Sequence, residues 1–478
     1  MLFRHSALYL LARGFPAVIN LLAIALYTRL LGTDEYGQYA IVIAAVSLLN
    51  AVFFSWLILG VERFLPAHSG SNQELFEAVA HVFLWLVGLT AILGGVLVLY
   101  FRQDQTLRWL IGLGVVMLWV QAWFELNLAV ARSKFAPLRY GAISALKAGI
   151  ALGLGTILIA LGYGTTGALL GLLAGLFLAS VSFGWGEWIG VRLRRVDRRV
   201  LLNLGSYGFP LTILFFLNFL VSSSDRFLLG YLMSVGAAGV YAAGYDLAQQ
   251  SVGLLMSVVN LAASPLIVRA MEDGGADAAR ERLRKSAFLL LGIAVPAVTG
   301  LCMLSDNIGN VILGKAFSKD ASLVIPLIAV AVLLSGIKSF YVDLGFQLAR
   351  ATHRLLWSVM GAALANILLN LWWIPLFGLV GAAYATIAAF AVGLGASMLL
   401  VRKVFVVPMP PRDTYKLLLA SAVMALSLWP IISFRGPIAL VMQVICGATV
   451  YIFFLWLLNA GGFRKKVGAF VERKWKYA

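Results

Sequence analysis

Apolar runs long enough to cross a membrane recur along almost the whole chain of 478 residues, and they limit the fold more than any other feature. A hydrocarbon core of roughly 30 Å is crossed by about 20 apolar residues in a helix. The chain is 62% hydrophobic, which is more apolar surface than a water-soluble domain of this size can bury. The alternating ten-residue segments of a membrane β-barrel are absent from the sequence. We therefore expect an all-α polytopic membrane protein.

The apolar runs predict about fourteen membrane-spanning helices. The predicted spans are 6–29, 39–61, 76–101, 108–131, 140–161, 164–190, 200–229, 240–267, 286–305, 322–349, 355–375, 378–401, 416–434 and 437–459.

The positive charges are concentrated on alternate connecting segments. With the N-terminus inside the cell, 27 of the 37 lysines and arginines lie in cytoplasmic segments and seven lie outside. This asymmetry in short loops is the basis of the positive-inside rule, so we expect both termini to be cytoplasmic. The rule also accounts for the net charge of +17, and no nucleic-acid partner is expected.

A repeated unit divides the chain into two halves. Gly-Phe-Pro occurs at Gly14–Pro16 and again at Gly208–Pro210. Each copy continues through an apolar run to an arginine, a short turn and Gly-x-Tyr-Ala, at Gly37–Ala40 and Gly239–Ala242. The two halves therefore each begin with the same unit.

Two further pairs of motifs support the repeat in the same order. Ala131-Arg132 and Ala349-Arg350, 218 residues apart, each end the fourth span of a half, and Gly164–Ala168 and Gly378–Ala382, 214 apart, share the pattern Gly-x-x-Gly-Ala. An even number of spans per half gives both halves the same orientation, so the pseudo-twofold axis is expected along the membrane normal.

The repeat predicts three parts of the chain. They are an N-terminal lobe of six spans (1–199), a C-terminal lobe of six spans (200–403), and two extra spans with a basic cytoplasmic tail (404–478).

Three cations inside predicted spans are the candidates for substrate binding: Arg13, Lys147 and Lys338. Charges in the membrane are costly and usually face a polar cavity or a partner. Their depth, from the cytoplasmic end to the middle, suggests a cationic cavity that opens inward and suits an anion such as a diphosphate. The alternative is structural: Arg13 and Lys147 are close enough to the interface to snorkel, and Lys338 can pair with Asp343 or Glu125.

Other charged residues in the spans are candidates for ion or proton coupling or for gating. They are Glu125, Asp225, Arg226, Asp246 and Asp343. The competing interpretation is again structural, because Asp225 and Arg226 can form a pair at a helix end and Asp246 can be a partner of Arg226.

Proline and glycine interrupt two matched spans and are candidate hinges for alternating access: Gly14 with Pro16, and Gly208 with Pro210. Proline removes one backbone hydrogen bond and bends a helix. A static kink, which is common in membrane helices, is the alternative.

Motifs of enzymes and metal sites are missing from the sequence. The two cysteines, Cys302 and Cys446, lie in separate apolar runs, and the four histidines are scattered, so neither a metal site nor a cofactor is expected. No nucleotide-binding loop, pair of catalytic carboxylates in an outer loop or nucleophile motif is present, which disfavours an enzyme or an ATP-driven pump.

Two stretches resemble a known family. TRLLGTDEYGQYA (28–40) is similar to the start of oligosaccharide flippases of the polysaccharide transport family, in the multidrug/oligosaccharidyl-lipid/polysaccharide (MOP) superfamily. SSSDRFLLGYLMSVGAAGVYAAGYDLAQ (222–249) is similar to that family's seventh and eighth spans, and the pattern of spans agrees over nearly the full length.

The resemblance implies a MATE-like fold of two six-helix lobes around a central cavity, with two extra helices beside it. It implies a transporter in a bacterial inner membrane that moves an undecaprenyl-diphosphate-linked oligosaccharide from the inner to the outer leaflet for exopolysaccharide or O-antigen synthesis. Polysaccharide polymerase and export components are then candidate partners, and by position Arg13, Lys147 and Lys338 are the basic cavity residues of such a transporter.

Three alternatives stay open at this point. A drug/cation antiporter of the same fold prefers an acidic cavity. A membrane glycosyltransferase or polymerase needs catalytic groups in a sizeable outer loop, and the outer loops here are short. A scaffold of a polysaccharide assembly complex tolerates loss of all three buried cations.

Overall fold

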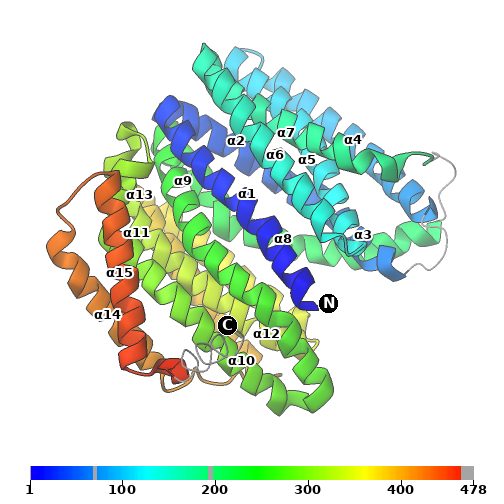
Figure 1. Ribbon diagram of the computed structural model, residues 1–478. Helices are drawn as coiled ribbons and strands as arrows, with labels where there is room; N and C mark the ends of the chain where they lie inside the picture. Colours follow the sequence, from blue (N-terminus) through cyan, green and yellow to red (C-terminus); the bar gives the residue numbers. More distant parts are fainter. Residues whose placement is uncertain (1, 68–72, 192–197, 465–478) are drawn as a thin grey trace, which may run out of the picture. The chain divides into compact units, whose positions relative to one another are not determined.

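The computed structural model describes residues 2–67, 73–191 and 198–464, and of residues 2–13, 67, 198 and 210 it describes the backbone alone. Every regular element within these residues is a helix (Figure 1). This confirms the all-α fold class predicted from the apolar runs.

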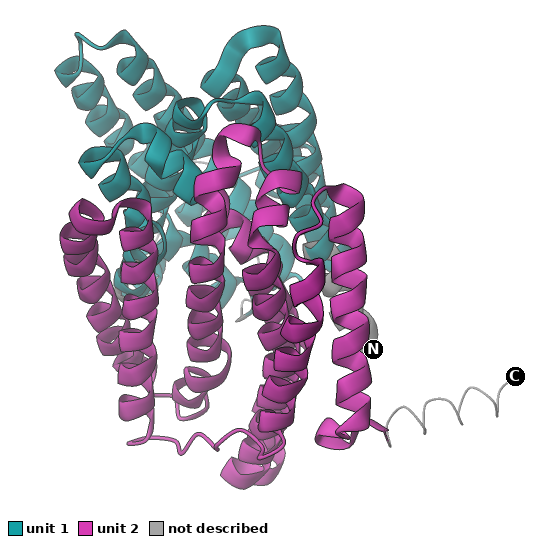
Figure 2. Cartoon of the chain, turned by 90° about the vertical axis from the view of Figure 1, so that its left-hand side faces the viewer, with its two compact units in different colours: residues 1–242 teal, residues 243–478 magenta. Residues whose placement is uncertain are grey.

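The chain forms two compact units, residues 1–242 and 243–478 (Figure 2). Unit 1 contains α1 (Leu2–Leu30), α2 (Thr33–Phe53), α3 (Ser55–Phe64), α4 (Gln73–Tyr100), α5 (Gln105–Ser133), α6 (Pro137–Leu158), α7 (Gly164–Trp188), α8 (Arg198–Leu232) and the start of α9 (Val235–Ala248). Unit 2 contains the rest of α9 with α10 (Leu254–Ile312), α11 (Lys315–Ile337), α12 (Leu344–Leu348), α13 (Leu355–Val401), α14 (Thr414–Leu428) and α15 (Pro437–Leu457). The three-part division into 1–199, 200–403 and 404–478 stays a prediction.

Three short π-helical segments interrupt these helices: η2 (Ile159–Tyr163), η3 (Gln249–Gly253) and η4 (Lys338–Val342). Segments of this kind are rare and frequently lie at functional sites. The third of them begins at Lys338, one of the predicted binding residues.

Ten helices within the described residues are long and apolar enough to cross a membrane, which makes this a multi-pass membrane protein. Three of them run for 52, 78 and 50 residues, far more than the roughly 20 that one crossing needs. Each contains a glycine with positive φ, Gly162 (90°), Gly275 (71°) or Gly378 (60°), at a place where the sequence predicts a turn between two spans. The total of fourteen spans stays a prediction.

The Gly-x-x-Gly-Ala motifs have the same local geometry in both copies. Gly164 (φ 48°, ψ −132°) and Gly378 (φ 60°, ψ −136°) adopt a conformation that only glycine tolerates well. Three residues later, a side chain on Gly167 would overlap the backbone of Leu158, and one on Gly381 would overlap the backbone of Trp373. The motif therefore makes a tight turn and then packs the next helix closely against the preceding one.

The pairing of Ala131-Arg132 with Ala349-Arg350 needs a correction of three residues. Left-handed residues follow α5 and α12 at Phe135 (φ 51°) and Arg350 (φ 53°). In each case the next amide bonds back five residues, from Ala136 to the Ala131 carbonyl at 3.0 Å and from Ala351 to the Phe346 carbonyl at 2.8 Å, which is a Schellman-type helix end. The structural equivalents are thus 215 residues apart, close to the spacing of the glycine motifs.

Helices α2 and α9 cross at the glycines of the two Gly-x-Tyr-Ala motifs. A side chain on Gly37 would overlap the carbonyl of Val235, and one on Gly239 would overlap the carbonyl of Thr33. Each glycine thus meets the residue four positions before the other glycine. A reciprocal contact of this kind is expected where two copies of a repeated motif are related by a pseudo-twofold axis.

We expect Gly37→Ala to destabilise the protein. The added methyl group cannot fit against the Val235 carbonyl, so the backbones must separate, and overpacking of this kind typically costs about 1–3 kcal/mol. Thermal unfolding of the purified protein in detergent measures the effect. Gly95→Ala in α4 is the matched control, because nothing lies within 4 Å of its added carbon and alanine favours a helix over glycine. Equal unfolding midpoints for the two variants would contradict this close contact of α2 with α9.

Candidate functional site

A cavity of about 290 Å³ lies in unit 1 among α1, α2, α5, α6 and α7. Its lining combines apolar side chains with polar and charged ones, and the latter are Asn20, Tyr27, Tyr39, Ser47, Gln121, Glu125 and Lys147. All of these residues except those of α1 lie in helices that are long and apolar enough to span a membrane. Polar groups at such depth usually mark the path of a substrate or an ion.

Glu125 of α5 is held at the cavity by two side-chain amides. Asn50 Nδ2 donates a hydrogen bond to one carboxylate oxygen at 2.8 Å, and Gln121 Nε2 donates to the other at 3.1 Å. Asn50, on α2, is only 4% exposed, and its Oδ1 accepts no hydrogen bond from the described residues. A buried acceptor without a donor is uncommon, and Asn50 does not itself line the cavity but holds Glu125 from behind it.

Lys147 of α6 lines the same cavity as Glu125 and is attracted to it electrostatically. The hydrogen bonds to Glu125 nevertheless come from the two amides rather than from this lysine. The side chain of Lys147 is half-buried. Its ammonium group is therefore a positive charge at a polar cavity, and no direct ion pair within the described residues neutralises that charge.

Two tyrosines form a fixed wall of the cavity. Tyr27 Oη donates to the carbonyl of Ala151 at 2.6 Å, and its ring meets that of Tyr39 edge to face with 5.7 Å between the centroids. Pairs in this geometry add to the stability given by burial alone. The wall ties α1 to α2 and α6, so that the cavity has a defined shape.

Lys338 lies in unit 2 and has a direct partner. Its Nζ is 2.7 Å from Asp343 Oδ2, and the two side chains are 8% and 7% exposed. The other carboxylate oxygen accepts from Ser397 Oγ at 2.7 Å, which is 2.9 Å from Ser358 Oγ. The structural alternative, pairing of Lys338 with Asp343, is thus realised, and a cavity-lining role for Lys338 stays a prediction.

Asp225 and Arg226 are buried within α8, which continues to Leu232 beyond the predicted end of the span. Asp225 is fully buried and accepts a hydrogen bond from Tyr241 Oη at 2.7 Å. Tyr241 is a partner that sequence reasoning missed, although it belongs to the Gly-x-Tyr-Ala motif. Asp246 is half-buried in α9, and coupling roles for these groups stay predictions.

The four candidate hinge residues lie in continuous helices, with Gly14 and Pro16 in α1 and Gly208 and Pro210 in α8. A side chain on Gly208 would overlap the backbone of Trp56, so close packing is a second reason for glycine there. The side chains of Arg13 and Pro210 lie outside the described residues.

A second cavity in unit 1, of about 600 Å³, lies among α2, α4 and α5 and is lined mainly by apolar side chains. Its character suits hydrocarbon rather than a hydrated glycan. Among the described residues, no group of three or more His, Cys, Asp or Glu side chains could hold a metal ion.

Comparison with solved structures shows the fold. A structure described as "Lipid II flippase MurJ, inward closed conformation" has a TM-score of 0.78 at 16% identity, covering 95% of this chain and 99% of that one. An inward-facing MATE family multidrug resistance transporter of the MOP superfamily has a TM-score of 0.63 at 15% identity, covering 83% and 98%. The chain therefore has the fold of MOP superfamily transporters.

Comparison with known sequences places the chain in a family. It is 28% identical over 255 residues to "Probable flippase AglR" of Haloferax volcanii, a match that covers 51% of this chain and 51% of that protein. The chain thus matches about half the length of that relative. The family described as "Polysaccharide biosynthesis protein" matches residues 26–322. Since that is more than half of the sequence, the chain belongs to this family of polysaccharide biosynthesis proteins.

Proposed function

We propose that this protein is a flippase that moves an undecaprenyl-diphosphate-linked oligosaccharide from the inner to the outer leaflet of a bacterial cytoplasmic membrane, for exopolysaccharide or O-antigen synthesis. The observation that carries the proposal is the Lys147 ammonium group at a polar cavity among membrane-spanning helices. The family, and the likeness to a probable flippase, support the same function.

The cavity in unit 1 offers complementary chemistry for both polar parts of this substrate. Lys147 binds the diphosphate, since charge-assisted hydrogen bonds are the strong ones and gain where water is scarce. The amides of Asn20 and Gln121 and the hydroxyl of Ser47 are suited to sugar hydroxyl groups. The polyprenyl tail stays in lipid. In this proposal Arg13, seven residues and about two helical turns before Asn20 in the sequence of α1, is a further cation for the substrate.

Transport proceeds by alternating access in this proposal, with the cavity exposed to each side of the membrane in turn. Moving one charge across the membrane involves about 2.3 kcal/mol per 100 mV. A potential that is negative inside therefore favours outward movement of a doubly charged anion by about 4–5 kcal/mol. Glu125, Asp225, Asp246 and Asp343 are the candidates for coupling to an ion or proton.

Reconstitution tests the proposal directly. Purified protein is placed in liposomes with a fluorescent polyprenyl-diphosphate oligosaccharide in one leaflet, and its appearance in the other leaflet is followed with and without an imposed potential. We expect transport with wild-type protein, and more of it when the receiving side is positive.

The alternatives give different results in the same assay. A cation antiporter leaves the lipid in place but exchanges an organic cation for protons or sodium. A glycosyltransferase or polymerase changes the mass of the glycan, which mass spectrometry detects. A scaffold shows neither activity, and that outcome, across several glycans and potentials, would overturn the proposed function.

A further inference from the structure

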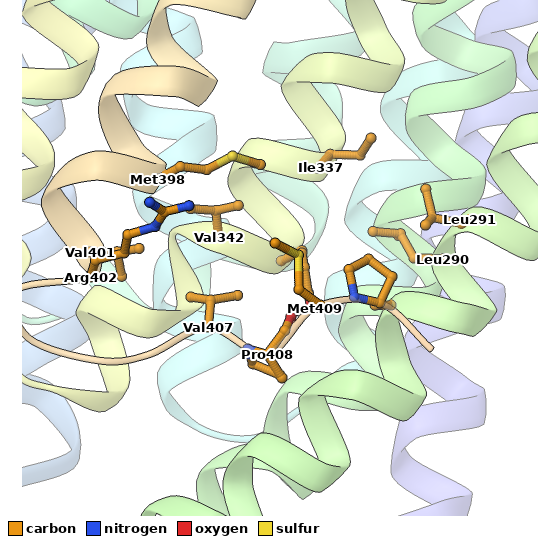
Figure 3. A pocket seen from close by; sticks show the side chains of 13 residues that line it. Leu290, Leu291, Ile337, Val342, Met398, Val401, Arg402, Val407, Pro408 and Met409 are labelled. Carbon is orange, nitrogen blue, oxygen red and sulfur yellow. Dashed lines mark hydrogen bonds between the residues drawn. The ribbon is translucent and has the colours of Figure 1, made fainter. Parts of the chain in front are cut away.

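A pocket of about 180 Å³ in unit 2 shares no residue with the cavity in unit 1 and is not used by the proposed mechanism. Figure 3 shows it between α10, α11, α13 and the non-helical strap, residues 404–411, that leads toward α14. Its inner surface is apolar and includes Leu290, Leu291, Ile337 and Met398. The charge distribution predicts that this end of the helices is cytoplasmic.

The strap is fixed over the pocket by side chains of α10 and η4. Tyr341 Oη donates to the carbonyl of Pro408, and Arg280 Nε donates to the carbonyl of Val406 at 3.3 Å. The Arg280 guanidinium also lies 5.4 Å from the centre of the Phe405 ring, and Phe405 is only 5% exposed. These contacts fix the position of the strap at the pocket.

The pocket borders apolar side chains that are exposed on the surface. Met409 of the strap is 78% exposed and Met398 is 39% exposed, and both line the pocket. These exposed side chains and the lining of the pocket form a continuous apolar surface, which is suited to a hydrocarbon chain.

A positive charge stands at the edge of this apolar pocket. Arg402 lines it together with Met398 and Val342 (Figure 3). The side chain of Arg402 is exposed, and no carboxylate of the described residues forms an ion pair with it. Arg284 of α10 is near enough to interact electrostatically with Tyr341, another residue of the lining.

We propose that this pocket binds an anionic phospholipid of the cytoplasmic leaflet, with one acyl chain in the apolar pocket and the phosphate on Arg402 and Arg284. Basic pockets between membrane helices on the cytoplasmic side bind anionic headgroups, and guanidinium groups match phosphate oxygens geometrically. The lipid and the site are complementary in two respects. The acyl chain fits the apolar pocket, and the phosphate carries the charge opposite to that of Arg402. This site is separate from the proposed transport cavity and does not depend on which glycan is moved.

Native mass spectrometry of the full-length protein in a neutral detergent tests the proposal, with phosphatidylglycerol and phosphatidylcholine as probes. We expect wild-type protein to retain phosphatidylglycerol in preference to phosphatidylcholine. Arg402→Gln should weaken phosphatidylglycerol binding about fivefold, the effect of one basic residue near an anionic membrane. Lys403→Gln, which removes the neighbouring exposed charge that does not line the pocket, should bind like wild type.

Two further arms separate the sources of binding. Met398→Trp, at a partly exposed lining position, should fill the pocket and weaken binding of both lipids. Glycerol 3-phosphate should compete poorly, because it lacks the acyl chain. Equal binding by Arg402→Gln and Lys403→Gln, equal retention of the two lipids, or effective competition by glycerol 3-phosphate would each overturn the proposal. Displacement of phosphatidylglycerol by a short polyprenyl diphosphate would also overturn it, since the pocket would then take the transported class of lipid.

Discussion

Replacing Lys147 with glutamine should reduce the initial rate of lipid-linked oligosaccharide transport by about 10- to 100-fold. The variant keeps a polar side chain at the cavity but loses the positive charge, and hydrogen bonds to charged groups contribute about 1.5–3 kcal/mol. The lower rate is expected because the variant binds the diphosphate more weakly. The measurement is the rate at which fluorescent substrate changes leaflet in proteoliposomes that contain equal amounts of folded protein.

Two controls make this result specific. Lys147→Arg retains the charge and should keep most of the activity, while Lys319→Gln removes an exposed positive charge outside the cavity and should have little effect. If Lys147 is unimportant for an anionic substrate, or if the protein exports cations, Lys147→Gln will transport as fast as wild type.

The double variant Lys147→Gln/Glu125→Gln separates substrate binding from a structural role. Lys147 and Glu125 attract each other across the cavity, so loss of one partner leaves the other with an uncompensated charge. If that imbalance causes the defect, the double variant will regain activity. If Lys147 binds the diphosphate, the double variant will stay impaired although it folds.

The charges of the site in unit 1 could be predicted from the sequence, but their partners could not. A lysine and a glutamate inside apolar runs are conspicuous, because such residues are rare in membrane helices. Asn50, which donates to Glu125 from 75 positions away in the chain, carries no signal of its own. The contact depends on how α2 packs on α5, and single-sequence patterns contain no information about that packing.

The repeat shows the same limit for the fold. The equivalence of Gly164 and Gly378 could be predicted from the sequence, because their backbone conformation favours glycine over all other residue types. The equivalent helix ends at Phe135 and Arg350 share geometry but not residue type, since hydrogen bonds and not a side chain fix a Schellman-type end. Matching identical residues therefore paired Arg132 with Arg350, whereas the residue that is structurally equivalent to Arg350 is Phe135, three positions later.

The pairing of Lys338 with Asp343 depends on a departure from regular helix geometry. Residues five apart in an α-helix do not face each other, because neighbours on one face are three or four apart. Here Lys338 begins the π-helical segment η4, and the Asp343 amide bonds to the Lys338 carbonyl at 2.8 Å across five residues. This local widening brings the ammonium and the carboxylate together, and helical periodicity alone does not predict it.

We expect Lys338→Met and Asp343→Leu each to lower the free energy of unfolding by about 3–5 kcal/mol, the usual effect of leaving one partner of a buried ion pair alone. Asp343→Leu also removes the acceptor of the Ser397 hydroxyl. The double variant Lys338→Met/Asp343→Leu should recover much of the stability, since apolar replacement of both partners is often neutral. Thermal unfolding in detergent, followed by tryptophan fluorescence, compares all four proteins.

Transport by the double variant then decides between the two roles of Lys338. If the lysine serves to hold η4 in place, the stable double variant will transport at nearly the wild-type rate. If Lys338 leaves Asp343 during the cycle and binds the diphosphate, as the sequence predicts for a cavity cation, the double variant will be folded and inactive. Unchanged stability in both single variants would mean that water reaches the pair, and would contradict its buried character. The stability and transport results together therefore distinguish a structural ion pair from one that opens for the substrate.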